Sequence, residues 1–183
     1  MAAELCITSN FTFLTGASHP EEYMERAALL GLSAIAIADV NSVAGIVRAH
    51  TQAKEIAHRV AERDEILARD GPIGPPCPAH LPRPVSAPIR NVPRLIPAAR
   101  LVFVEGIEMT ALAQTRAGWA RLCRVISKGR LRAEKGDCTL HLEDLLDDAT
   151  GLQLILHPPA RRPVAAWTGQ ARRLVRACAG QMH

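Results

Sequence analysis

The sequence predicts an α/β fold in which strands and helices alternate along the chain and form a partial barrel. Residues 32–38 are nearly all apolar, as expected of a strand that is covered on both faces. In residues 116–127 the apolar side chains recur at helical spacing, which predicts an amphipathic helix. Such alternation is typical of a parallel sheet or barrel, and the roughly four strands that we expect are too few to close a barrel.

The N-terminal part of the chain contains two predicted strands and two predicted helices. The first strand is expected at residues 5–8. Ser18 is the expected N-cap of the first helix, because a proline and two glutamates follow it, and Gly31 is expected to end that helix. After the strand at residues 32–38, a second helix is expected at residues 42–55, with a possible extension to residue 68.

Residues 70–97 differ in character from the rest of the chain, since they contain nine of its 13 prolines. Proline lacks a backbone N–H and fixes φ, so we expect a disordered insertion here. A polyproline II segment that binds a partner domain is the alternative interpretation. The resulting domain organisation has four parts: 1–69, the first part of the folded domain; 70–97, the insertion; 98–157, the continuation of the domain; and 158–183, an Arg-rich, incomplete tail.

Regular structure is expected to resume after the insertion. Residues 101–104 are rich in β-branched and aromatic side chains and predict a strand. The amphipathic helix at 116–127 follows, then a short helix at 140–146 and a buried strand at 152–156.

The composition excludes several classes of protein. The formal net charge of +4 is compatible with a polyanionic neighbour, but aromatic residues make up only 3% of the chain, which argues against a stacking platform for single-stranded bases. The five cysteines form no CxxC pair, so neither a zinc knuckle nor a disulfide framework is expected. Neither a signal peptide nor a membrane-spanning run is evident. We therefore expect a cytoplasmic protein with no membrane contact.

Four sequence blocks carry a family resemblance. They are AELCITSNFTFLTGASHPEE at 3–22, GLSAIAIADVNSVAG at 31–45, LIPAARL at 95–101 and AGWARLCRVISKG at 117–129. In this order the blocks resemble the PHP (polymerase and histidinol phosphatase) domain at the N-terminus of C-family bacterial DNA polymerases, and most of all its error-prone, DnaE-type branch.

The resemblance implies a (βα)7 barrel of the PHP type, here truncated, which in active members holds a trinuclear metal cluster for phosphoester hydrolysis. The family ligands are mainly histidines at the strand ends. The positions that match them in this chain are Cys6, Thr8, Asp39, Val40 and Leu101. Because these residues cannot together hold a metal cluster, we expect a degenerate site with no catalytic residue and no cofactor.

The resemblance also implies a function. We expect a structural PHP domain of an error-prone DNA polymerase that acts in translesion synthesis and DNA repair, with the rest of the polymerase and damage-tolerance proteins as partners. The polymerase carboxylates would lie beyond residue 183, so this fragment alone is expected to be inactive. The alternatives are a metal-dependent PHP phosphoesterase, a non-catalytic binding module and a decayed remnant.

Several single residues invite functional hypotheses that have simpler explanations. His157 ends a predicted strand, where α/β enzymes place ligands, but the prolines after it equally mark a strand exit. His50 and His58 could share a helical face, although a solvated surface is the better interpretation. Asp39 is expected to cap the helix that begins near residue 42, and Cys6 to be a small buried apolar residue.

Basic residues are concentrated after residue 115. DNA phosphates or an acidic protein surface could bind them, and a solvated or interdomain face is the alternative. The residues that we single out for possible nucleic-acid contact are Arg121, Arg124, Lys128, Arg130 and Arg132.

Overall fold

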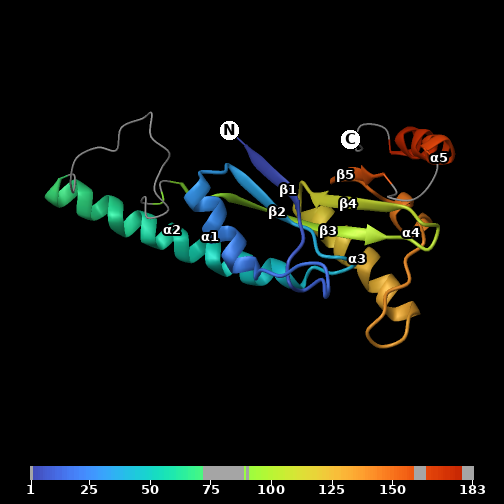
Figure 1. The fold of residues 1–183 in the computed structure, drawn as a ribbon, viewed down its shortest axis with the longest axis horizontal. Helices are drawn as coiled ribbons and strands as arrows, with labels where there is room; N and C mark the ends of the chain where they lie inside the picture. The colour runs from blue at the N-terminus through green and yellow to red at the C-terminus, as the bar shows by residue number, and fades with distance from the viewer. Residues whose placement is uncertain (1, 72–88, 90, 159–163, 179–183) are drawn as a thin grey trace.

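The structure of the chain is a computed structural model that describes residues 2–71, 89, 91–158 and 164–178 (Figure 1). Most of the predicted insertion, and part of the Arg-rich tail, lie outside the described residues. The elements in chain order are β1 (Ala3–Ile7), α1 (Pro20–Leu30), β2 (Ala34–Ile37), α2 (Ala44–Asp70), β3 (Arg94–Val102), β4 (Glu108–Ala113), α3 (Arg116–Arg132), α4 (Glu143–Leu146), β5 (Leu152–His157) and α5 (Val164–Ala177).

The strands form one curled sheet in the order β1-β2-β3-β4-β5. The first three strands are parallel, while β4 is antiparallel to both β3 and β5. The α/β class and the partial barrel are confirmed, but the expectation of about four parallel strands is wrong. The strand that was missed is β4, which forms a hairpin with β3.

Most boundaries differ by a few residues from the sequence-based expectation, and the starts of β3 and α1 are described here. Strand β3 begins at Arg94, inside the predicted insertion, and pairs with β2 from its first residue onward. Helix α1 begins after His19 rather than after Ser18: the His19 backbone N–H donates to Glu22 Oε2 at 2.8 Å. The expected end of α1 at Gly31 is confirmed, with a left-handed φ of 69°.

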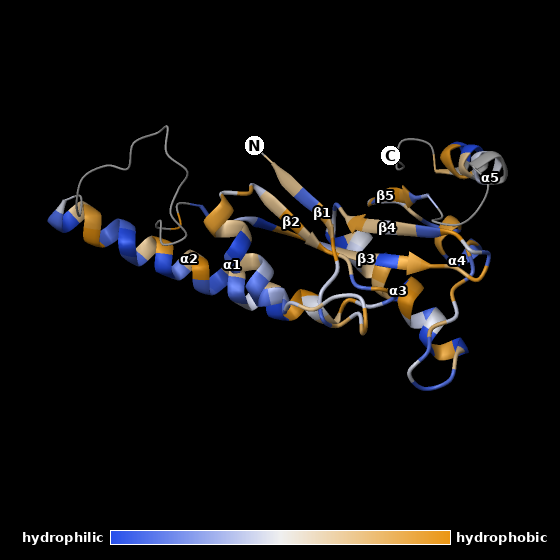
Figure 2. Ribbon diagram, viewed as in Figure 1, coloured by the Kyte–Doolittle hydropathy of each residue, from blue (hydrophilic) through white to orange (hydrophobic). Residues whose placement is uncertain are grey.

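Helices α1, α2 and α3 cover the outer face of the sheet (Figure 1). The outward-facing residues of β2, among them Ile35 and Ile37, pack on α1 and α2. Leu101 and Met109, on β3 and β4, pack on α3 through Leu122. This alternation follows from the period of two in a strand. The C-terminal half of α2 projects beyond the sheet and is largely polar (Figure 2).

The inner face of the sheet carries smaller side chains. Ala36, Ala38, Ala98 and Leu112 form a separate apolar layer there. No helix within the described residues has both the length and the apolar character needed to span a membrane.

Candidate site at the carboxyl ends of the strands

Asp39 lies two residues after the end of β2 and is almost completely buried, with 1% of its surface exposed. Its Oδ1 accepts hydrogen bonds from the Ser9 backbone N–H at 2.8 Å and from Thr12 Oγ1 at 2.9 Å. Its Oδ2 accepts from Ser9 Oγ at 2.8 Å. Ser9 and Thr12 are themselves buried. The carboxylate of Asp39 therefore fastens the loop after β1 to the end of β2.

The expectation that Asp39 caps the following helix is wrong. Helix α2 begins after Val43, which contributes no side-chain cap. The helix nevertheless approaches the carboxylate closely, since a Cβ on Gly45 would lie 2.7 Å from Asp39 Oδ2. The positive end of the α2 dipole thus faces the negative charge of Asp39. The sequence identified Asp39 as a strand-end residue but did not identify its partners Ser9 and Thr12. Their hydroxyl groups, in the loop that follows the first strand, were the signal that could have revealed them.

The inner face of β3 presents Arg100 and not Leu101. Leu101 packs in the outer core, whereas Arg100 pairs across the ladder with Thr110. Directly opposed residues in a sheet share a face. Leu101, which the resemblance matches to a ligand position, therefore faces the outer core, and the neighbouring residue that faces the inner side is Arg100.

Four polar side chains gather on this inner face at the ends of β3, β4 and β5. The Arg100 guanidinium forms an ion pair with Glu108, with Nε 3.0 Å from Oε2. Thr110 Oγ1 lies 2.8 Å from His157 Nε2. Burial, together with the positive charge of Arg100, lowers the pKa of His157, although Glu108 opposes this effect. The lowered pKa favours the neutral form of His157. Its imidazole is hydrogen-bonded to Thr110 on the neighbouring strand β4.

The other predicted ligand positions, and the two histidines of α2, form no group that could bind a metal ion together. Cys6 is partly buried, and the backbone N–H of Val40 donates to Thr12 Oγ1 at 3.0 Å. His50 and His58 are both exposed on α2. Among the residues that the structure describes, no three His, Cys, Asp or Glu side chains lie close enough to hold a metal ion together.

The predicted nucleic-acid contacts lie on α3 and are mostly engaged within the chain. Arg121 forms an ion pair with Asp148, and Arg132 binds both oxygens of Asp144 at 2.8 and 3.1 Å. The Arg132 guanidinium lowers the pKa of Asp144 to about 2. Arg130 donates to the backbone oxygen atoms of Gly136 and Asn41, at 3.0 and 3.1 Å. Two cations on this helix, Arg124 and Lys128, remain exposed with no hydrogen-bonded partner among the described residues.

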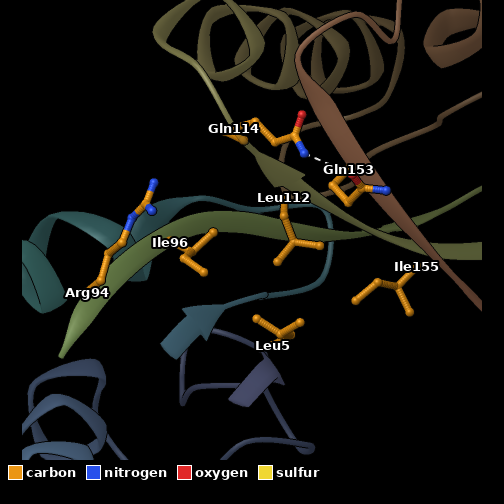
Figure 3. A pocket seen from close by; sticks show the side chains of 8 residues that line it. Leu5, Arg94, Ile96, Leu112, Gln114, Gln153 and Ile155 are labelled. Carbon is orange, nitrogen blue, oxygen red and sulfur yellow. Dashed lines mark hydrogen bonds between the residues drawn. The ribbon is translucent and has the colours of Figure 1, made fainter. Parts of the chain in front are cut away.

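A hollow of about 490 Å³ lies on the inner face, toward the opposite ends of the strands. Figure 3 shows Leu5, Ile96, Leu112 and Ile155 around it, with Gln114 donating to Gln153 at 2.8 Å on one side. Ligands of α/β proteins bind at the carboxyl ends of the strands. This apolar hollow lies at the other ends of the strands, away from Asp39 and His157.

Comparison with known proteins places this geometry in a family. The family model described as "PHP domain" matches residues 4–157. The chain is 47% identical over 167 residues to an error-prone DNA polymerase of Ruegeria pomeroyi, covering 87% of the chain, and 37% identical over 175 residues to one of Rhodopseudomonas palustris, covering 94%. It spans only 15% and 13% of the length of these relatives.

A solved structure supports the fold. An amidohydrolase from Chromobacterium violaceum, with bound sulfate and no metal, aligns with a TM-score of 0.59 at 13% identity, over 100% of this chain and 76% of the other. The resemblance seen in the four sequence blocks is thereby confirmed. The chain belongs to the PHP domain family and is similar to the N-terminal domains of error-prone DNA polymerases.

Proposed function

We propose that the chain is a metal-free PHP domain that acts as a structural module of an error-prone DNA polymerase in translesion synthesis and DNA repair in the bacterial cytoplasm. The observation that carries this proposal is the use of Asp39. Its two carboxylate oxygens accept three hydrogen bonds from Ser9 and Thr12. A carboxylate that accepts these hydrogen bonds holds a loop in place. In an active PHP domain, the resemblance implies a metal ligand at this position.

The donor set at the other strand ends supports the same interpretation. Divalent metal ions that activate water are held by imidazole, thiolate or carboxylate ligands. Thr8 and Val40 supply none of these groups, and Arg100 brings a positive charge that repels a cation. Glu108, a carboxylate on the same face of the sheet, is paired with Arg100. These residues do not fit a trinuclear cluster, and no hydrolytic step is assigned to the chain.

The inner hollow supports a role within a larger protein. Its lining is largely apolar, and burial of such surface stabilises a protein by roughly 25 cal/mol per Å². Leu5, Ile96 and Ile155 are only partly buried. The remainder of a polymerase polypeptide would cover them, with damage-tolerance proteins as further partners of the assembled enzyme.

A domain exchange tests the structural role. Residues 1–183 replace the matching N-terminal segment of the Ruegeria pomeroyi polymerase, and primer extension is measured beside the same polymerase with that segment deleted. We expect the exchanged protein to extend primers and the deleted one to lose activity or aggregate. An exchanged protein as defective as the deletion would contradict the proposal.

Contact with DNA is a second, weaker role that Arg124 and Lys128 support. Both are exposed cations one helical turn apart on α3. Asp144, Asp147 and Asp148 lie beside the same depression and reduce the positive potential. Any contact would therefore be to phosphates and independent of sequence.

A further inference from the structure

The loop between β1 and α1 exposes two large apolar side chains at its tip. Phe13 is 85% exposed and Leu14 fully exposed, at 108%. They follow one another in sequence, and the loop lies beside the N-terminal end of α2 (Figure 2). Next to them Arg48 of α2 packs over the ring of Phe11, with its guanidinium carbon 5.9 Å from the ring centroid. Aromatic and arginine side chains are enriched in protein interfaces, and an apolar side chain that is fully exposed in a free domain loses contact with water when a partner covers it.

This loop is held in one conformation by its backbone. Asn10 N–H donates to Ser18 O at 2.9 Å, and Thr12 O accepts from the N–H groups of Thr15 and Gly16, at 3.2 and 3.0 Å. Gly16 packs directly on Ser9, where a Cβ would come within 2.0 Å of the carbonyl oxygen. The Asp39 hydrogen bonds fix the base of the loop. The exposed pair is therefore presented by an ordered segment.

Leu14 also has an unfavourable backbone conformation, with φ of 62°. A leucine in the left-handed region is strained, whereas Asn or Gly tolerates it. The loop thus keeps an apolar side chain where a polar residue would suit both the backbone and the solvent. Such a combination indicates that the side chain acts outside the isolated domain.

Resting on the proposed function, we propose that Phe13 and Leu14 anchor this domain to the remainder of the polymerase polypeptide. Two side chains of this size bury on the order of 300–400 Å². A stable complex between separate chains needs about 800 Å² per partner. A tethered segment of the same polypeptide has an effective concentration in the millimolar range, so a small anchor suffices. The relatives place this domain in a polypeptide at least six times its length, since the chain spans at most 15% of them.

The test places loop variants in the exchanged Ruegeria polymerase and in the isolated chain. The informative variant is L14N, with F13S/L14N as the stronger form and L131S, at another exposed leucine, as the matched control. In the isolated chain we expect L14N to raise the unfolding midpoint, because it relieves backbone strain. In the exchanged polymerase we expect L14N and F13S/L14N to lower the midpoint and to raise the rate of limited proteolysis at the domain junction about tenfold.

The outcomes separate this inference from the proposed function. If F13S/L14N behaves like L131S in an active exchanged polymerase, the docking role is overturned while the structural role stands. If the isolated chain forms a dimer that F13S/L14N abolishes, the occupant is a second copy and the inference is wrong. If the exchanged polymerase fails with the native loop, the proposed function itself is contradicted, and the anchoring role falls with it.

Discussion

Replacement of Asp39 is the perturbation that the structure specifies most fully. In D39A, three hydrogen bonds to one buried carboxylate are lost together. The Thr12 hydroxyl keeps its role as acceptor for the Val40 N–H, and the Ser9 hydroxyl can rotate. The backbone N–H of Ser9 has no such freedom, and it is left in a cavity without an acceptor.

The magnitude follows from these contacts. Hydrogen bonds to a charged group contribute about 1.5–3 kcal/mol each, and an unsatisfied buried donor costs about 1–3 kcal/mol. Water entering the space of the carboxylate recovers part of this loss. We expect D39A to lower the free energy of unfolding by about 3–5 kcal/mol, a large part of the roughly 5–15 kcal/mol typical of a domain. D39N keeps the shape of the side chain and one carbonyl oxygen, so we expect it to lower the free energy of unfolding by about 1–2 kcal/mol.

Urea unfolding of the isolated chain, followed by far-ultraviolet circular dichroism, measures these differences. D64A is the control, because Asp64 is an exposed carboxylate on α2 whose removal should change stability by less than about 0.5 kcal/mol. A loss below about 1 kcal/mol in D39A would refute the assignment of Asp39 as a structural fastener. Equal losses of stability in D39A and D39N would also refute it. D39N keeps the shape of the side chain and one hydrogen-bond acceptor, so it should lose less stability than D39A.

Three further predictions concern titration and DNA. The pKa of Asp144 is lowered to about 2 by Arg132, so this pair stabilises the fold above about pH 4 and ceases to do so as the pH falls toward 2. The difference in unfolding midpoint between wild type and D144N should therefore shrink between about pH 4 and about pH 2. A difference that stays constant over this range would contradict the prediction. The pKa of His157 is lowered in the folded state, so stability should fall as the pH drops below about 6.5, and H157Q should lose that dependence in urea titrations at successive pH values. If Arg124 and Lys128 contact phosphates, R124A/K128A should reduce the slope of log Kd against log salt for duplex DNA by about 1.8, whereas an unchanged slope would remove these residues from any interface.

The fold was largely predictable because its signals are local. The apolar run at 32–38, the periodicity of α3 and the glycine that ends α1 each depend on a few neighbouring residues. Strand β4 was missed because Ala111 and Ala113 have low β-propensity and its alternation is short. The Glu105-Gly106 turn between the two strands was the signal that could have revealed the hairpin.

The site was less predictable because its contacts join distant parts of the chain. Asp39 could be identified at a strand end, but its partners Ser9 and Thr12 lie 30 and 27 residues away. Which of Arg100 and Leu101 faces the inner side depended on strand register, because a shift of one residue moves a side chain to the other face. Likewise, the run of cations on α3 did not reveal that Arg121 and Arg132 are paired with aspartates of the following segment.

Metal content is the measurement that tests the central claim most directly. The purified chain is incubated with excess Mn²⁺ or Zn²⁺, separated from free ions by gel filtration, and measured by mass spectrometry beside an assay for hydrolysis of bis(4-nitrophenyl) phosphate. If the domain is metal-free as proposed, we expect substoichiometric metal and no hydrolysis, because Thr8 and Val40, which the family resemblance matches to ligand positions, cannot bind a metal ion through their side chains as imidazole would. Retention of about two or three ions per chain, with metal-dependent turnover, would contradict it.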